Sequence, residues 1–301
     1  MKCLRPIFLD TDEFDIYPTG KLPVPCGKCE ACRNDDSNQW RIRLKEHFYS
    51  SDNAIFITLT YTDDKLPFAE CTLDNGRTTW HETFSKPDIQ KFFKRFRKKF
   101  ESYYKEKETK FSYFLVSEYG PTYFRPHYHA LLFNVPVLSD IPEIQNFKIT
   151  EEIYNLWGKG FVKVDNCNEA RICYCTKYMS CVTQIPEYLP KPFRMISKGI
   201  GKSYISNEKL LRWHKDALNC YYQDGQFKLK LPKYYKDKIF DEDEKKLLRE
   251  LYFIKLEENP DKLFSYSWQP GAIRSLKDKQ EKIRAFKRTY YKKSLKTRKD
   301  I

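Results

Sequence analysis

The sequence predicts an α+β fold, in which a mainly antiparallel sheet is covered by helices and followed by a helical, basic C-terminal extension. Segments rich in β-branched and aromatic residues alternate with amphipathic segments, and some neighbouring strands lie close enough along the chain to pair antiparallel. We divide the chain into a cysteine-rich segment 1–35, a core 36–185, and an extension 186–301 that contains a hairpin and charged helices.

The first elements follow from local patterns. Residues 1–35 are rich in proline and are expected to be irregular, whereas residues 37–48 carry apolar side chains at helical spacing. Residues 54–61 predict a strand that ends at the turn before Pro67. A loop follows, and Ser85 then begins a long helix as its N-cap. The apolar stripe of that helix consists of Phe92, Phe93, Phe96, Phe100 and Tyr103.

The later elements are predicted in the same way. In chain order they are strands at 111–119 and 127–135, a helix at 150–157, a strand at 160–164, a helix at 169–182, a proline-rich connector, a helix at 206–217, a hairpin at 220–231, and helices at 234–258 and 273–296. The hairpin is expected to turn at Asp224-Gly225, a dipeptide typical of tight turns.

The charge of the chain favours a polyanionic partner. It has 301 residues, with 55 Lys or Arg against 41 Asp or Glu, and a formal net charge of +14. An excess this large points most simply to nucleic acid. No apolar run reaches the roughly 18–20 residues of a membrane span, and residues 1–6 do not resemble a signal peptide. We therefore expect no membrane partner, and ten cysteines that serve as thiols or metal ligands in a reducing compartment.

Three cysteines have the spacing of metal ligands. Cys26, Cys29 and Cys32 form a C-x-x-C-x-x-C pattern, but a structural zinc site normally needs four ligands. Cys3 is the nearest further thiol, and His47 is a second candidate for the fourth ligand. The pattern alone leaves two alternatives, a structural zinc site and three free thiols.

The segment from Arg125 to Phe133 contains the sharpest chemical signal. His127 and His129 alternate on a predicted strand, so both imidazoles face the same side of the sheet. A hairpin with the preceding strand could bring Glu118 beside them. Two histidines and a carboxylate suit Mg²⁺ or Mn²⁺ acting on a phosphate. The alternative is that one histidine faces the core and the other is merely hydrogen-bonded.

Two tyrosines follow on a predicted helix. Tyr174 and Tyr178 stand at i and i+4, so both phenols project from one helix face, and Lys177 lies one turn from Tyr174. A phenol with a pKa of about 10 is a poor nucleophile unless a metal-polarised phosphate or a nearby ammonium assists it. The alternative is an aromatic pair packed on an amphipathic helix.

Basic residues elsewhere are candidate DNA contacts, namely Arg125 and, on the helix that begins near Ser85, Lys94, Arg95 and Lys98. The alternative for the helix is an ordinary solvated face. From Ala272 onward the chain has twelve Lys or Arg against three Asp or Glu, a block typical of nucleic-acid-binding arms. A nucleotide cofactor is not expected, because the Gly199–Lys202 segment has Ile196 where a phosphate-binding loop needs glycine.

Together these motifs resemble those of the HUH endonucleases, the superfamily of rolling-circle replication initiators. Within it the chain is similar to the replication initiation proteins of microviruses, in particular the gokushovirus type. Further motifs stand in the order of that family: Pro25-Cys26-Gly27-Lys28-Cys29, Trp40-x-x-Arg43, Phe56-Ile57-Thr58-Leu59-Thr60-Tyr61, Ser117-Glu118-Tyr119-Gly120 and Gly199-Ile200-Gly201-Lys202.

The resemblance implies specific roles. His127, His129 and Glu118 would hold Mg²⁺ or Mn²⁺. One of Tyr174 and Tyr178 would attack single-stranded origin DNA, leaving a 5′-phosphotyrosine and a free 3′-hydroxyl, and the second would allow religation. Lys177 would neutralise phosphate charge or orient the phenol. The implied partners are host helicase and polymerase, and the implied location is the cytoplasm of an infected bacterium.

Two alternatives to this function stand beside it. One is a non-catalytic nucleic-acid-binding protein that contains zinc. The other is a metal phosphohydrolase in which water attacks and no tyrosine is used.

Overall fold

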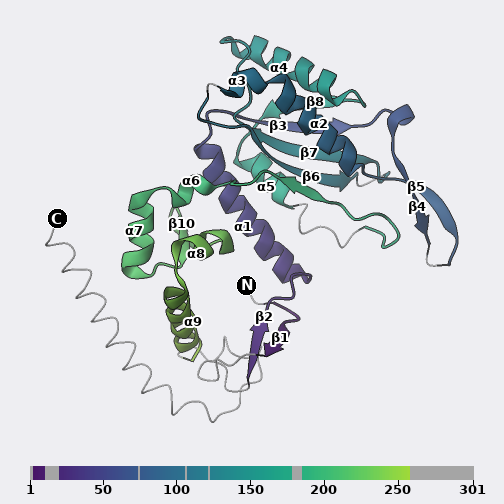
Figure 1. Cartoon of the computed structure of the whole chain (residues 1–301). Helices are drawn as coiled ribbons and strands as arrows, with labels where there is room; N and C mark the ends of the chain where they lie inside the picture. Colours follow the sequence, from purple (N-terminus) through teal and green to yellow (C-terminus); the bar gives the residue numbers. More distant parts are fainter. Residues whose placement is uncertain are drawn as a thin grey trace. The chain divides into compact units, whose positions relative to one another are not determined.

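The computed structural model describes residues 3–10, 20–73, 75–105, 107–120, 123–177 and 185–257 (Figure 1). Contacts within these residues define two compact units. One comprises residues 30–203, and the other comprises residues 3–29 together with the described residues from 204 onward. None of the helices in these ranges has the length and apolarity that a bilayer crossing requires.

A five-stranded antiparallel sheet forms the centre of the first unit, as the sequence predicts. Its order is β8-β3-β7-β6-β9, and every neighbouring pair is antiparallel. The strands are β3 (Ala54–Thr60), β6 (Ser112–Tyr119), β7 (Pro126–Phe133), β8 (Val162–Asn166) and β9 (Arg194–Ile196). The first four were predicted within a few residues. The fifth comes from the proline-rich connector, which the sequence did not identify as a strand.

Three helices cover one face of this sheet: α2 (Lys86–Lys99), α3 (Glu101–Lys105) and α4 (Pro142–Trp157). The predicted N-cap is confirmed, since the Ser85 hydroxyl accepts the Asp88 N–H at 3.3 Å. The phenylalanines of the predicted stripe are buried against the sheet. The long helix breaks at Phe100, and α4 begins eight residues earlier than predicted.

Two helices cover the opposite face: α1 (Glu30–Tyr49) and α5 (Glu169–Lys177) (Figure 1). The predicted start of α1 at Ser37 is wrong, because its polar first turns show no apolar periodicity in the sequence. Ser37 lies inside the helix, and its hydroxyl donates to the Thr176 carbonyl of α5 at 2.7 Å. The predicted end of the second helix, beyond Lys177, lies outside the described residues.

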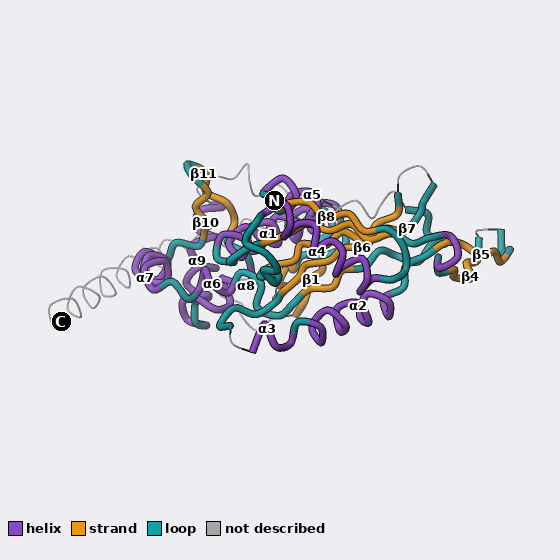
Figure 2. Tube along the Cα trace, turned by 90° about the horizontal axis from the view of Figure 1, so that it is seen from above, coloured by secondary structure: helices purple, strands orange, loops and turns teal. Residues whose placement is uncertain are grey.

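The expected loop after β3 is largely a hairpin. After a short 3-10 turn (Asp63–Lys65), β4 (Phe68–Thr72) pairs with β5 (Thr78–Glu82). It projects past the end of the sheet where β6 and β7 are joined (Figure 1, Figure 2). Only one of its faces is covered, and the side chains of Phe68 and Trp80 stay exposed on the other. Short strands with one open face carry a weak periodic signal, which explains the missed prediction.

The second unit consists of small elements. These are β1 (Ile7–Asp10), β2 (Lys21–Val24), α7 (Glu208–Ala217), β10 (Tyr221–Asp224), β11 (Phe227–Lys230), α8 (Lys233–Ile239) and α9 (Glu242–Glu257), with the short α6 (Lys202–Ile205) at its start. The β10–β11 hairpin is as predicted. The irregular segment 1–35 instead contains the β1–β2 hairpin.

The helix predicted at 234–258 is two helices. Asp241 and Glu244 each accept the other's backbone N–H, at 2.8 and 2.9 Å. This reciprocal capping box starts a new helix, α9, after the buried Phe240. The helix predicted at 273–296 lies outside the described residues.

A close backbone approach fixes the loop that enters β8. A Cβ added at Gly160 would lie 2.4 Å from the Thr60 carbonyl oxygen and 2.6 Å from the Thr62 nitrogen. The same loop pairs with β3, because Thr62 N–H donates to the Lys159 carbonyl at 3.0 Å. Only glycine fits this position without moving the edge of the sheet.

We therefore expect Gly160→Ala to destabilise the protein by about 3 kcal/mol, near the upper end for overpacking. Gly158→Ala is the matched control: Gly158 is also left-handed, but its added Cβ would meet nothing closer than 3.6 Å. Its expected cost is about 1 kcal/mol, from the backbone conformation alone. Urea unfolding followed by circular dichroism measures both, and equal losses would contradict the steric explanation.

Candidate active site

The sheet brings Glu118 and His129 into contact. In the β6–β7 register Glu118 lies opposite His127, and His129 lies two positions further along β7. The Glu118 Oε2 and His129 Nε2 atoms are 3.0 Å apart, with side chains only 12% and 9% exposed. The sequence prediction that a hairpin places this carboxylate beside the histidines is therefore met for His129.

Thr58 and Phe56 orient the His129 ring from the neighbouring strand. The Thr58 hydroxyl lies 3.0 Å from His129 Nδ1, and the Phe56 ring stacks on the imidazole at an interplanar angle of 10°. When Nδ1 carries the proton and donates it to Thr58, the lone pair of Nε2 faces Glu118. A second hydrogen bond of this kind is what usually fixes the tautomer of a metal-binding histidine.

His127 lies on the same face of the sheet and is half-buried. Its Nδ1 atom is buried without a hydrogen-bond partner, and a Cβ added at Gly120 would come within 3.0 Å of its Nε2. Burial and the neighbouring His129 lower the pKa of His127. The imidazole is therefore neutral at pH 7, which is the form that binds metals.

These residues fit a hard divalent cation. Glu118 Oε2, like His127 Nδ1, is buried without a hydrogen-bond partner, although it touches His129. Buried polar atoms normally find a partner, and a carboxylate with two imidazoles suits Mg²⁺ or Mn²⁺. The three residues do not form a tight cluster of ligand atoms: within the described ranges, only a group of cysteines brings three or more ligand atoms within 4.8 Å of one another.

Tyr174 of α5 reaches the same place. Its hydroxyl lies 3.4 Å from His129 Nε2, and its ring meets His129 edge-on at 5.1 Å and Phe56 at 6.0 Å. Ile172, Cys175 and Thr176 are the buried residues of the helix, and they leave Tyr174 half-buried at the site. Lys177 is exposed at the last residue of α5, and Tyr178 lies outside the described residues.

The basic residues predicted to contact DNA are divided between two places. Arg125 stays at the site end of β7, where it pairs with Asp63 at 2.7 Å and donates to the Tyr61 carbonyl at 2.8 Å. Lys94, Arg95 and Lys98 lie on α2, which packs on the sheet face opposite Glu118 and His129.

Arg95 also has a structural contact. Its guanidinium donates to the carbonyl groups of Leu156 and Trp157, at 2.9 and 3.3 Å, at the C-terminus of α4. The structure therefore does not bring the α2 residues together with the candidate site.

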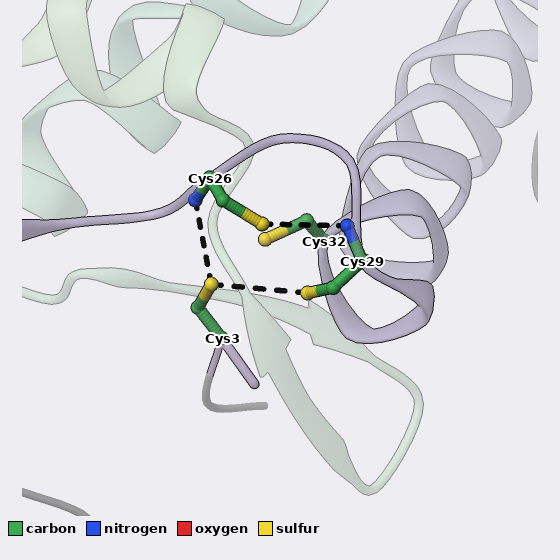
Figure 3. A group of neighbouring side chains, drawn as sticks. All are labelled: Cys3, Cys26, Cys29 and Cys32. Carbon is green, nitrogen blue, oxygen red and sulfur yellow. Dashed lines mark hydrogen bonds between the residues drawn. The ribbon is translucent and has the colours of Figure 1, made fainter. Parts of the chain in front are cut away.

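The cysteine pattern gains a fourth member. Cys3, Cys26, Cys29 and Cys32 have all four Sγ atoms within 4.8 Å of one another (Figure 3). His47, the other candidate, instead lies 2.7 Å from the Ser112 hydroxyl, with a pKa lowered to about 4 by burial. These four thiols could hold a metal ion.

Sequence reasoning missed the supporting residues Thr58 and Phe56. Both lie in the segment 56–61 and share the β3 face that looks toward α5. Period-two alternation marks them as neighbours on one face, but only the register of β3 on β7 places Thr58 opposite His129.

Comparisons with known proteins agree with this geometry. Residues 54–182 match a family of phage replication-associated proteins described under the name ORF2. The chain is also 29% identical over 267 residues to replication-associated protein ORF2 of Spiroplasma virus 4, covering 78% of this chain and 79% of that protein. This chain is related to the replication-associated proteins of microviruses.

Two further relatives extend the similarity. Replication-associated protein VP4 of Bdellovibrio phage phiMH2K is 26% identical over 262 residues, or 79% of this chain and 76% of that protein. Replication-associated protein ORF4 of Chlamydia phage 1 is 26% identical over 184 residues, or 57% of this chain and 42% of that protein. No solved structure matches significantly. The family resemblance predicted from the motifs is confirmed.

We expect Mn²⁺ binding to depend on this site. Glu118→Gln and His129→Ala should each abolish tight binding, because each removes a ligand. Thr58→Val should weaken it about 10- to 100-fold, the usual loss when the partner that orients a ligand is removed.

Mn²⁺ titration followed by electron paramagnetic resonance measures these affinities. His81→Asn is the matched control, since His81 lies on the β4–β5 hairpin, where its Nε2 is 2.6 Å from the Thr79 hydroxyl. Unchanged affinity in Thr58→Val would contradict its orienting role.

Proposed function

We propose that this protein initiates rolling-circle DNA replication by nicking single-stranded origin DNA with a tyrosine and later religating the product. The observation that carries the proposal is the distance of 3.4 Å from the Tyr174 hydroxyl to His129 Nε2, which itself touches Glu118. A phenol held beside a histidine–carboxylate pair is what tyrosine attack on a phosphate would need.

Two further findings support it. The related phage proteins are named replication-associated, and the family match spans β3, β6, β7 and α5, the elements that carry the site. The net charge of +14 suits a polyanionic substrate. The site lies within the predicted core 36–185, which we propose as the catalytic domain between the cysteine-rich segment 1–35 and the extension 186–301.

The reaction is a transfer of the phosphodiester to the phenol. A bond forms between the Tyr174 oxygen and the scissile phosphorus as the bond to the 3′-oxygen breaks. The phenol loses a proton and the leaving 3′-oxygen gains one. The protein then carries the 5′ end, and the free 3′-hydroxyl primes synthesis. The energy of the phosphodiester is retained in the phosphotyrosine link, so resealing needs no nucleotide cofactor.

The chain's own residues would orient and stabilise this step. Glu118, His127 and His129 would hold Mg²⁺ or Mn²⁺, which polarises the scissile phosphate as a Lewis acid. His129 and Phe56 fix the plane of the Tyr174 ring through their edge-on contacts. Lys177, exposed one turn from Tyr174, would offset the charge of the phosphate.

The remaining roles follow from the same proposal. Tyr178, one turn after Tyr174 in the sequence, would cut the regenerated origin after one round of synthesis. Arg125, at the site end of β7, would contact the DNA backbone near the cut. Lys94, Arg95 and Lys98 would bind DNA beyond the site, on the other face of the sheet. Host helicase and polymerase would act on the nicked origin in the cytoplasm of the infected bacterium.

A covalent adduct tests the proposal. Incubation with Mn²⁺ and labelled single-stranded origin DNA should give a protein–DNA band that survives denaturing gel electrophoresis. Tyr174→Phe combined with Tyr178→Phe should abolish that band, because no phenol remains to attack. His129→Ala should lower the rate by about 100-fold or more through loss of metal.

Tyr154→Phe is the matched control, because Tyr154 is exposed on α4, across the sheet from the site. Cleavage that survives the double substitution would favour a phosphohydrolase in which water attacks. Binding with neither cleavage nor an adduct would favour a non-catalytic nucleic-acid-binding protein.

A further inference from the structure

We propose that Cys3, Cys26, Cys29 and Cys32 bind one structural zinc ion as a closed set of four thiolates. In Figure 3 their sulfur atoms point toward one another from three parts of the chain: the segment before β1, the loop that follows β2, and the first turn of α1. This site is independent of the chemistry proposed for Tyr174 and His129.

The sulfur spacing suits zinc and excludes a disulfide. All four Sγ atoms lie within 4.8 Å of one another, and Cys3 Sγ is 3.8 Å from Cys29 Sγ. A disulfide needs about 2.05 Å. Tetrahedral zinc with bonds of about 2.3 Å places its sulfur ligands about 3.8 Å apart.

The backbone around the group stabilises thiolates. Cys26 N–H donates to Cys3 Sγ and Cys29 N–H donates to Cys26 Sγ, each at 3.3 Å. The N–H groups of Lys28 and Cys29 lower the pKa of Cys26. Gly27 allows this turn, because its φ of +72° lies in the left-handed region.

Other cysteines have the opposite environment. Burial raises the pKa of Cys167 to about 12 and raises that of Cys175 as well, so both stay protonated in the core. Within the described ranges, no other thiols join a group of three or more possible ligands. The thiols that gather at the start of α1 are thus also the ones whose surroundings favour the metal-binding form.

The number and kind of ligands select the metal and its role. Four soft thiolates suit tetrahedral zinc and disfavour Mg²⁺ or Mn²⁺. A set of four protein ligands leaves no open position for water or substrate, so the ion would be structural. Lys28 and Arg33, adjacent in sequence to Cys29 and Cys32, supply positive charge beside a site with four thiolates.

The site would fix where α1 begins. Cys32 lies in the first turn of α1, and one turn later Ser37 donates to the Thr176 carbonyl of α5. Further along, Trp40 packs on Phe114 of β6. Because α1 packs on the helix that carries Tyr174, zinc would stabilise the support of that helix without touching substrate.

Metal analysis of the full chain tests the proposal. Protein purified without added metal should contain zinc, and protein reconstituted with Co²⁺ should show the intense near-ultraviolet absorption of cobalt–thiolate bonds. That absorption reports sulfur ligands, so metal at the histidines does not contribute. Cys3→Ser and Cys29→Ser should each lower the band and weaken zinc retention about 100-fold, as expected for loss of a ligand. Cys173→Ser, an exposed cysteine outside the group, should leave both unchanged.

Wild-type protein provides a second measurement if the variants fail to fold. A mercurial reagent that blocks thiols should release one zinc per chain and lower the melting temperature. Absence of the cobalt–thiolate band, iron in place of zinc, or a disulfide among the four cysteines would each overturn the proposal. So would full zinc retention in Cys3→Ser, because the fourth ligand would then lie elsewhere.

Discussion

The pairing of β7 with its two neighbours is the constraint on which the site depends. β7 is the central strand of the sheet, and its register sets Thr58 of β3 and Val116 of β6 on either side of His129. Because side chains alternate with period two, a slip of one residue would turn both histidines toward α2 and α4. The apolar residues of β7 would move with them, so the energy that holds the core together also holds the histidines in place.

That constraint makes the two faces of the sheet unequal. The face under α2 and α4 is filled by aromatic side chains such as Phe92, Phe96 and Trp157. The face under α1 and α5 is apolar at one end, around Phe133 and Leu44, and becomes polar toward His129. A buried imidazole is costly without partners, and Thr58 and Glu118 reduce that cost. The polar end of a covered face is thus where chemistry is compatible with the fold.

Local patterns predicted most of the fold and the main site residues. His127, His129 and Tyr174 could be assigned to faces because strand and helix periodicities are local. The polar first turns of α1, the open-faced β4–β5 hairpin and the three-residue β9 lack such a signal. Thr58 was missed for a different reason, since its neighbour is 71 residues away and only the sheet register relates the two. The α2 residues were correctly expected to be basic and outward, but the face of the sheet that α2 covers is a tertiary property.

The cysteine group divides in the same way between local and distant information. Cys29 and Cys32 are three residues apart at a helix start, and the left-handed Gly27 turns Cys26 back toward them. Three members of the group are therefore encoded within seven residues. The fourth, Cys3, is 26 residues from its nearest-paired thiol, Cys29. Closing a loop of that length costs conformational entropy, which a metal–thiolate bond can offset, so ion binding and the ordering of this segment would be one process.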